Sequence, residues 1–229
     1  MRGPGGGIRY NSAVNLSPRS LLLPLALLIF ALALGILVHY GISGLAPAGG
    51  PPVEGMLWPP TKTLANFDLI DNKGKAFNLE RLHGKWSFLF FGYTHCPDLC
   101  PATMNVFKLV ARQIAVDHQN GDTQFVFVTV DPARDTPKQL DNYVTYFNPE
   151  FIGAGGSDRQ IEGLTSQLGV VHMRVKNDGG ADYQMDHSAA IMLVGPKTRL
   201  LAVFSPPHVP REIAARYEAI RAFLAKDPG

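Results

Sequence analysis

The stretch Phe90–Pro101, FFGYTHCPDLCP, contains both cysteines of the 229-residue chain. An apolar run from Ser87 to Phe91 leads into it and predicts a short buried strand. A helical pattern follows, and because proline favours the first helical position, Pro101 predicts Cys100 as the helix N-cap. The Cys-x-x-x-Cys pair is therefore expected on a strand-to-helix turn.

A cysteine pair in this position can carry redox or metal chemistry. Backbone N–H groups and the macrodipole at a helix N-terminus favour negative charge, and so favour thiolate over thiol. Two thiolates this close can form a disulfide or bind a soft metal ion. The three intervening residues exceed the two of the thioredoxin redox motif. A purely structural disulfide is disfavoured, because so small a loop would contribute only about 2 kcal/mol or less.

The N-terminal region predicts a membrane segment. Leu21–Val38 contains no charged residue, and its length corresponds to about 27 Å of helix, nearly the thickness of the hydrocarbon core of a bilayer. Arg2, Arg9 and Arg19 precede this run, and no acidic residue does. The positive-inside rule therefore predicts a cytoplasmic N-terminus and export of everything after about residue 44.

A cleaved signal peptide is the alternative interpretation, since residues 46–48 (Ala-Pro-Ala) resemble a small-residue cleavage site. The apolar run is longer than the usual signal-peptide core, and proline occupies the middle cleavage position, which favours an uncleaved anchor. We expect a basic cytoplasmic tail at 1–19, a transmembrane anchor at 20–43, a linker rich in Pro, Gly and Ala at 44–60, and one domain at 61–229.

The exported part is almost neutral. Three of the 21 Lys and Arg residues precede the apolar run, which leaves 18 basic residues against 19 acidic ones. No basic block indicates binding to nucleic acid. Two cysteines in an exported domain would oxidise to a disulfide unless they are kept reduced or bound to metal.

Strands and helices are expected to alternate after the linker. Strands are expected at 87–91, 125–130 and 170–175, helices at 102–118, 137–147, 157–169 and 210–226, and hairpins at 67–79 and 189–204. Capping boxes at Thr136–Gln139 and Ser157–Gln160 mark two of the helix starts. This order predicts an α/β, thioredoxin-like fold with a mixed central sheet flanked by helices and an insertion around 148–186.

The expected fold brings a histidine to the cysteines. His187 immediately precedes the strand expected at 189–194, and in a thioredoxin-like sheet the loop before that strand lies beside the redox turn. His187 can therefore converge with Cys96 and Cys100 despite the distance in sequence. Two thiolates and one imidazole suit Cu(I), and they tolerate Cu(II) or Zn in altered geometry. Surface, hydrogen-bonded or structural roles are expected for the other histidines of this domain: His83, His95, His118, His172 and His208.

Three motifs together resemble the signatures of the Sco/SenC family. They are Phe91–Pro101 (FGYTHCPDLCP), Val130–Pro137 (VDPARDTP) and Asp186–Ser188 (DHS). The resemblance covers about 60–226 in the family's order and spacing. It implies a membrane-anchored, thioredoxin-fold copper protein that serves assembly of the dinuclear copper centre of cytochrome c oxidase, as copper donor, thiol-disulfide reductase or both.

The resemblance also implies roles for single residues. Cys96, Cys100 and His187 match the family's copper ligands, and Asp131 matches a family acid near the site. The residues alone leave two interpretations of Asp131 open. It either forms the turn at a strand end, as Asp before Pro commonly does, or it tunes the metal or the thiols from outside the ligand set.

Two functions share these residues. A metallochaperone would deliver Cu(I) or Cu(II) to the copper-bearing subunit of the oxidase. A thiol-disulfide oxidoreductase would keep the cysteines of that subunit reduced, and would use Cys96 and Cys100 as its redox pair. Thiol exchange needs a low-pKa thiolate and a resolving partner, not an imidazole at metal-bonding distance. The motif around His187 therefore favours copper.

A peroxidase of the same fold is disfavoured, because it would need one activated thiol and the sequence supplies a pair. The expected partners are the copper-bearing oxidase subunit, other periplasmic copper chaperones and thiol reductases. The expected location is the inner (cell) membrane, crossed once, with the C-terminal domain on the periplasmic side.

Overall fold

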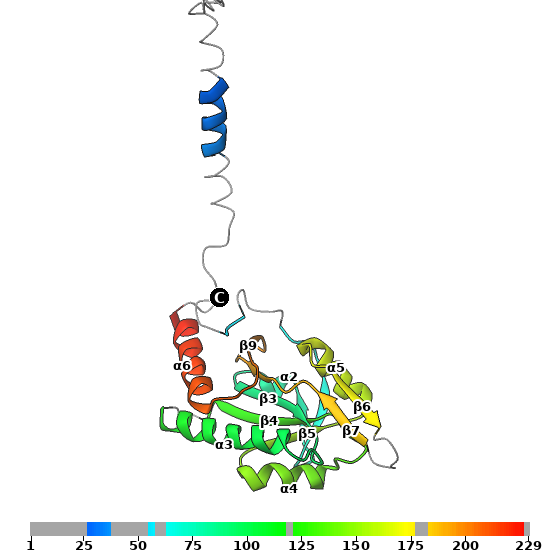
Figure 1. The fold of residues 1–229 in the computed structure, drawn as a ribbon. Coiled ribbons are helices and arrows are strands. Elements are labelled where there is room, and N and C mark those ends of the chain that lie inside the picture. The colour runs from blue at the N-terminus through cyan, green and yellow to red at the C-terminus, as the bar shows by residue number, and fades with distance from the viewer. Residues whose placement is uncertain (1–26, 38–54, 58–62, 118–120, 177–182, 227–229) are drawn as a thin grey trace, which may run out of the picture. The chain divides into compact units, whose positions relative to one another are not determined.

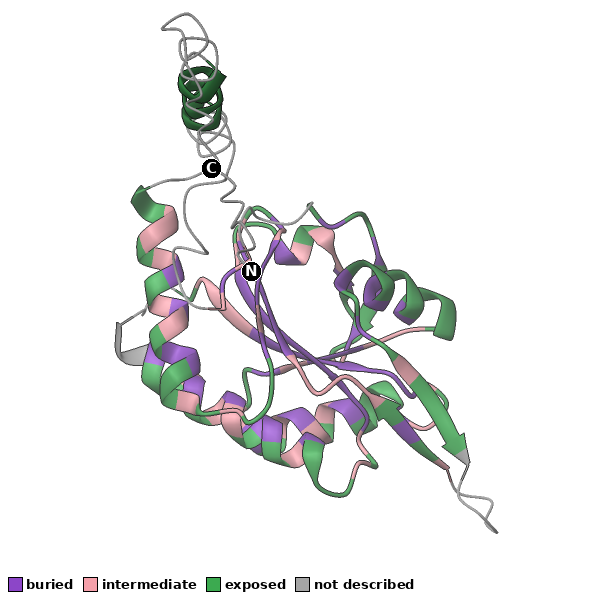
Figure 2. Cartoon of the chain, turned by 45° about the horizontal axis from the view of Figure 1, so that its top comes forward, coloured by how far each residue is buried: buried purple, intermediate pink, exposed green. Residues whose placement is uncertain are grey.

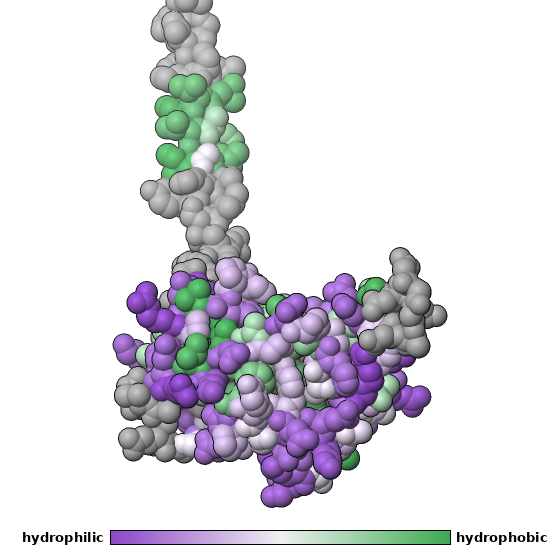
Figure 3. Space-filling model, turned by 60° about the horizontal axis from the view of Figure 1, so that its bottom comes forward, coloured by the Kyte–Doolittle hydropathy of each residue, from purple (hydrophilic) through white to green (hydrophobic). Residues whose placement is uncertain are grey.

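The computed structural model describes residues 27–37, 55–57, 63–117, 121–176 and 183–226. The chain divides into two compact units, residues 1–49 and residues 50–229. In the first unit, residues 27–37 form an exposed helix with a predominantly hydrophobic surface (Figure 3). Among the described residues, no helix is long and apolar enough to cross a membrane. The basic tail predicted at 1–19, and most of the predicted anchor and linker, lie outside the described ranges.

The second unit is built on a seven-stranded mixed sheet with the strand order β2-β1-β5-β4-β3-β8-β9 (Figure 1). Three central strands run parallel: β3 (Trp86–Gly92), β4 (Thr123–Thr129) and β5 (Ile152–Gly155). Antiparallel strands flank them: β1 (Asp68–Asp71) and β2 (Ala76–Asn78) at one edge, β8 (Ile191–Val194) and β9 (Leu200–Phe204) at the other. The predicted α/β fold with a mixed central sheet is confirmed.

The centre of the sheet is a packed aromatic core. Every residue of β3 is buried, and the central strands form the buried middle of the unit in Figure 2. Phe88 stacks on Phe125 of β4, with ring centroids 4.9 Å apart. Phe88 also contacts Phe107 and Tyr217, which belong to helices α3 (Leu99–Asp117) and α6 (Pro210–Lys226). The strand that leads to the cysteines is therefore held from both neighbouring strands and from two helices.

Two helices begin as their sequences predict. Helices α4 (Pro137–Phe147) and α5 (Asp158–Leu168) each start with a complete capping box, at Thr136 and Ser157 respectively. In each box the hydroxyl accepts an amide of the first turn, and a glutamine returns to the amide of the capping residue. Gly169 ends α5 in the left-handed conformation, at φ 68°.

Two other helix starts differ from prediction. Helix α3 begins at Leu99, so Cys100 lies inside its first turn, and the prediction of Cys100 as N-cap is wrong. The Asp98 carbonyl accepts the amide of Ala102 at 3.1 Å. Pro101 fits this start because the amides of the first helical turn have no partner within the helix. The expected hairpin strand also ends early, because a one-turn helix α2 (Leu79–Leu82) starts after it, capped by Asn78.

The predicted insertion at 148–186 contains part of the main sheet. Strand β5 pairs with both β4 and β1, and its sequence, Ile-Gly-Ala-Gly, was too short and glycine-rich to predict a strand. A Cβ at Gly153 would lie 3.0 Å from Cβ of Leu140, so the missing side chain lets α4 pack directly on the strand. The insertion prediction is therefore wrong for this strand.

The remaining part of that region forms a separate antiparallel hairpin of β6 (His172–Lys176) and β7 (Tyr183–His187). The intervening residues 177–182 lie outside the described ranges. His187 is the last residue of β7 rather than part of a loop, and β8 begins at Ile191 rather than at 189. The hairpin gives the histidine a strand of its own beside the main sheet.

Candidate metal centre

Three side chains converge where the hairpin meets the start of α3. The sulfur atoms of Cys96 and Cys100 and a ring nitrogen of His187 all lie within 4.8 Å of one another. Cys100 Sγ is 3.5 Å from His187 Nε2, and the Cys100 amide donates to Cys96 Sγ at 3.3 Å. The two cysteines are not joined by a disulfide. The structure thus brings together the three residues that the sequence motifs single out.

Gly92, the last residue of β3, makes room for the buried sulfur. A Cβ at this position would lie 2.7 Å from Cys100 Sγ and 2.9 Å from a ring carbon of Phe127. Cys100 is fully buried, whereas Cys96 is only partly buried. Sequence reasoning did not single out Gly92, although a glycine between an apolar strand and a cysteine pair was an available signal.

The His187 ring is oriented with one nitrogen toward the sulfurs. Its Nδ1 lies 3.1 Å from the carbonyl oxygen of Ser188. A carbonyl can only accept, so Nδ1 carries the proton and Nε2 presents its lone pair to Cys100. The rings of Phe90 and Tyr93 meet the imidazole edge-on, with centroids 6.0 and 5.9 Å away. These contacts orient the Nε2 atom of His187 toward the two sulfur atoms.

The two thiols differ in acidity. The hydrogen bond from the Cys100 thiol lowers the pKa of Cys96 to about 4, against the opposing effect of partial burial. Hydrogen bonds from the amides of Cys100 and Asp98 act in the same direction. For Cys100, the hydrogen bond to Cys96 and then burial raise its pKa above the ordinary range. Without metal, the pair is therefore one thiolate and one thiol at neutral pH.

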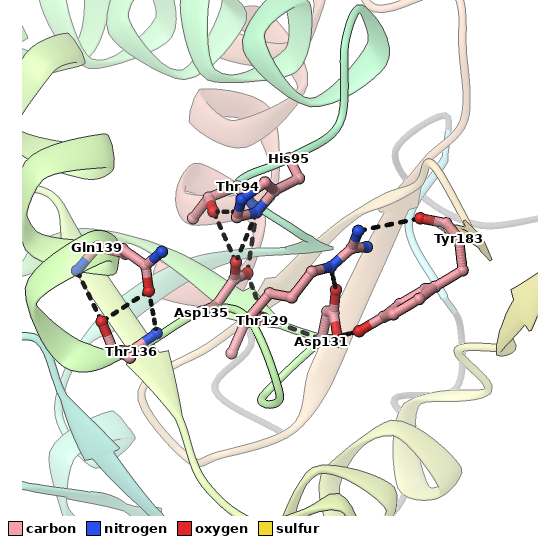
Figure 4. Close-up of polar contacts among 9 residues, drawn as sticks. Thr94, His95, Thr129, Asp131, Asp135, Thr136, Gln139 and Tyr183 are labelled. Carbon is pink, nitrogen blue, oxygen red and sulfur yellow. Dashed lines mark hydrogen bonds and ion pairs between the residues drawn. The ribbon is translucent and has the colours of Figure 1, made fainter. Parts of the chain in front are cut away.

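Asp131 is directed at the histidine hairpin (Figure 4). Its fully buried carboxylate accepts Tyr183 Oη–H at 2.7 Å and the Nε–H of Arg134. Arg134 also donates to the Tyr183 carbonyl at 3.0 Å and lies 3.8 Å from the centroid of that ring. Since Tyr183 begins the strand that ends at His187, Asp131 and Arg134 fix the strand that carries the imidazole.

A second acid from the same loop is directed at the cysteine turn. The Asp135 carboxylate accepts the Thr94 amide at 3.0 Å, the Thr94 hydroxyl at 2.6 Å and the Thr129 hydroxyl at 2.6 Å (Figure 4). It also lies 3.6 Å from Nδ1 of His95, the residue before Cys96. Sequence reasoning gave Asp135 no role at the site, although it belongs to the VDPARDTP motif. The loop that carries both acids therefore contacts both the strand that ends at His187 and the turn that carries the cysteines.

The other histidines occupy different positions. His83 is exposed at the end of α2, and His118 lies outside the described residues. His208 Nε2 lies 2.8 Å from the Ala189 carbonyl. His172 is paired directly with His187 across the hairpin.

Comparison with known proteins agrees with this geometry. A protein-family model described as SCO1/SenC matches residues 58–222. The chain belongs to the SCO1/SenC family. A SCO2-like protein of Rickettsia felis is 38% identical over 149 residues, which cover 65% of this chain and 72% of that protein.

Two solved relatives of this SCO1/SenC chain were determined with copper bound. ScoI of Bradyrhizobium japonicum is 34% identical, with a TM-score of 0.62 over 69% of this chain and 99% of that one. ScoI of Arabidopsis thaliana is 31% identical, with a TM-score of 0.62 over 70% of this chain and 97% of that one. The second unit therefore shares the thioredoxin-like fold of these copper-bound proteins.

The donor set fits a soft metal ion. Two sulfur ligands that can ionise and one neutral imidazole satisfy Cu(I), which accepts low coordination numbers, and they can also hold Cu(II). Metal binding would deprotonate Cys100, because a thiolate rather than a thiol is the ligand. Only Cys100 is fully buried among the three donors, whereas Cys96 and His187 are both partly exposed.

Proposed function

We propose that this SCO1/SenC protein is a membrane-anchored copper metallochaperone. It delivers copper to the copper-bearing subunit of cytochrome c oxidase while the dinuclear copper centre of that enzyme is assembled. The main support for this proposal is the convergence of Cys96, Cys100 and His187 within 4.8 Å. The solved relatives of the chain include copper-bound structures.

Each residue has a distinct part in binding and release. Cys96 is partly exposed and already a thiolate, so it is the first donor that incoming copper meets. Cys100 is buried and closes the site from the inside. His187 supplies the third donor from a separate strand. A site with two partly exposed donors can pass its ion to a partner by exchanging ligands one at a time.

Thiol-disulfide reduction is the second candidate, and the low pKa of Cys96 favours it. The Cys96 thiolate would attack a disulfide sulfur of the client, forming a mixed disulfide and releasing one client thiolate. The Cys100 sulfur would then attack the Cys96 sulfur and pass its proton to the second client thiolate as that leaves, which closes a Cys96–Cys100 disulfide. The client disulfide is the oxidant, and an external thiol reductase would have to restore the dithiol. His187 is not needed in this sequence.

Anaerobic Cu(I) titration of the purified full-length protein tests the binding site. The reduced protein should take up one Cu(I), and the oxidised protein should take up none until it is reduced, because a disulfide sulfur has no thiolate charge to donate. Single changes of Cys96 or Cys100 to Ser should weaken binding strongly, whereas His83→Gln should not. Equal uptake by the oxidised and reduced forms would show that the cysteines are not the ligands.

The His187→Ala variant separates the two candidate functions in cells. It removes one copper ligand but keeps the redox pair, so thiol-disulfide exchange should survive within a few fold. Failure of oxidase assembly with exchange intact would establish copper transfer as the essential role. Normal assembly by a variant without measurable Cu(II) binding would replace the metallochaperone with the reductase.

The location proposed for this activity is the inner (cell) membrane, with the domain on the periplasmic side. Support comes from the uncharged run Leu21–Val38 and the three arginines that precede it. A reporter fused after Gly229 should be active when it requires export. Activity of a reporter that works only in the cytoplasm would overturn this topology.

A further inference from the structure

The hairpin carries a second histidine beside the metal centre. His172 begins β6 and pairs directly with His187, the last residue of β7. Opposite residues of an antiparallel pair project from the same face, with Cβ atoms about 4.5–5.5 Å apart. His172 therefore projects from the face of the hairpin that His187 turns toward the cysteines. It is not part of the group of ligand atoms that lie within 4.8 Å of one another.

A cavity beside His172 contains further metal donors. It has a volume of about 550 Å³ and lies between α5 and the hairpin, with Val130 also in its wall. The donors in its lining are the His172 imidazole, the Met173 and Met185 thioethers, and the Asp158 and Glu162 carboxylates. Imidazole and thioether are ligands that suit Cu(I).

The donors are arranged for a site that is partly enclosed. The His172 side chain is 16% exposed, and its Nε2 lies 3.9 Å from a carboxylate oxygen of Glu162. Met185 is 8% exposed and shares the His172 face, because it is two residues from His187 on the same strand. The cavity thus has an inner sulfur donor, a mostly buried imidazole and an acid at its exposed side.

The charges around the cavity favour weak rather than tight binding of Cu(I). Arg159 and Arg174 line it together with Asp158 and Glu162, so the formal charges cancel. The Arg174 guanidinium lies 4.3 Å from the centroid of Tyr183. A neutral set of imidazole and thioether donors also binds Cu(I) without the thiolate charge that the main centre supplies. The expected affinity is therefore lower than at Cys96, Cys100 and His187.

We propose that His172 and Met185, with Glu162 at the rim, form an auxiliary Cu(I) site that passes the ion to His187. The proposal rests on the copper function proposed above. During transfer the His172 and Met185 donors are replaced by His187 and the Cys96 thiolate. Copper remains Cu(I), so no oxidant or reductant is required.

The auxiliary site is tested in a protein that lacks the main centre. The full-length chain carrying Cys96→Ser, Cys100→Ser and His187→Ala is titrated with Cu(I) anaerobically, in competition with a chromophoric Cu(I) chelator. One weaker equivalent should remain. Adding His172→Gln and Met185→Leu should weaken it by about tenfold or more, since even partners outside the ligand set affect metal affinity by 10- to 100-fold.

A matched control uses His83→Gln with Met104→Leu, an exposed histidine and a buried methionine of α3. Both pairs of changes keep side-chain volume nearly constant, and equal circular dichroism spectra establish that each variant is folded. The control pair should leave the residual equivalent unchanged. Absence of residual Cu(I), or residual binding that is the same with and without His172 and Met185, overturns the auxiliary site.

The transfer step is tested with the main centre intact. His172→Gln with Met185→Leu should slow loading of Cu(I) from the chelator complex and leave the final affinity unchanged. Loading at the unaltered rate overturns the transfer role. Failure of the unaltered protein to bind copper through its cysteines would instead defeat the proposed function, which the titration without the main centre does not test.

Discussion

The two cysteines and the histidine are held by very different parts of the molecule. The cysteines follow β3, all of whose residues are buried, and Cys100 has no exposed surface. His187 ends β7, in which only Met185 is buried, and the hairpin is mostly exposed or half-buried in Figure 2. The hydrophobic core therefore fixes Cys100 most firmly, whereas two aromatic edges and the polar contacts of its strand fix His187.

This difference would suit the proposed metallochaperone, which has to hold a metal ion and later release it. A ligand whose position depends on a small number of hydrogen bonds can leave the ion at low cost. The two thiols keep their spacing while that happens, because Gly92 and the start of α3 set the position of Cys100. The loop Asp131–Asp135 connects the halves, since one acid binds Tyr183 and the other binds Thr94.

The largest expected effect concerns the acidity of the cysteine half. Since the pKa of Cys96 is lowered to about 4, its thiolate persists as pH falls and disappears only near pH 4. The rate of iodoacetamide alkylation of the metal-free reduced protein should therefore change little between pH 8 and 5. An ordinary thiol of pKa about 8.5 would lose roughly 1,000-fold of its thiolate over that range.

Mass spectrometry should place the label on Cys96, because Cys100 is buried and its pKa is raised. The Cys96→Ser variant should react slowly at all of these pH values. If the alkylation rate instead fell with pH as it does for an ordinary thiol, Cys96 would not be the stable thiolate that the structure indicates.

The next effect compares the halves by copper oxidation state. Partners outside the ligand set contribute roughly 10- to 100-fold to metal affinity, so Cys100→Ser should weaken Cu(I) binding by more than about 100-fold. His187→Ala should weaken Cu(I) binding modestly and Cu(II) binding strongly, because Cu(II) prefers imidazole and higher coordination. Competition titrations with chelators for each ion measure both. Equal losses of Cu(I) affinity in the two variants would show that the site is not divided into a firmly held Cys100 and a more loosely held His187.

The cysteine half was predictable from sequence, and the reasons are local. Three local signals predict structure within a few residues of themselves. They are the apolar run before Cys96, the proline after Cys100 and the capping box at Thr136. These signals placed β3, the cysteine turn and helix α4 correctly. The error at Cys100 was one of boundary, since a proline fits any of the first positions of a helix.

The histidine half was predictable only in part. The sequence Tyr183–His187 has few β-branched residues, and its pairing with β6 depends on the register of a hairpin rather than on propensity. The contact of Tyr183 with Asp131 spans 52 residues. Such long-range polar contacts leave no periodic pattern, so the motif containing Asp131 was visible while its partner was not. Strand β5 was missed for a related reason: its glycines are explained by the close packing of α4 against the strand, which is also a long-range contact.

A smaller effect is expected at Gly92. In Gly92→Ala the added Cβ would press on Cys100 Sγ and on Phe127, and overpacking of this kind costs about 1–3 kcal/mol of unfolding free energy. The matched control is Gly163→Ala within α5, where a Cβ meets nothing within 4 Å. It should stabilise the protein by about 0.4–1 kcal/mol. Urea unfolding of both reduced variants measures the difference, and an unchanged stability in Gly92→Ala would show that the sulfur is not confined.

The smallest effect concerns the support of the histidine. Tyr183→Phe removes one hydroxyl, and with it the 2.7 Å hydrogen bond to Asp131. The ring remains available to pack against Arg134 and Arg174. Loss of an outer partner of a ligand should weaken Cu(II) binding by about tenfold, with a lesser change for Cu(I). Tyr146→Phe, at a side chain that is 82% exposed, is the control and should change neither.

A double-mutant cycle decides whether Tyr183 acts through His187. If the hydroxyl matters because it holds β7, Tyr183→Phe should have no further effect on Cu(II) affinity once His187→Ala has removed the imidazole. The two changes would then be coupled by the full effect of the first. If the effects are instead additive, Tyr183 and Asp131 influence the site through the cysteine half, by way of the loop that ends at Asp135. In that case the histidine is not separately adjustable, because its support and the support of the thiols respond to the same change.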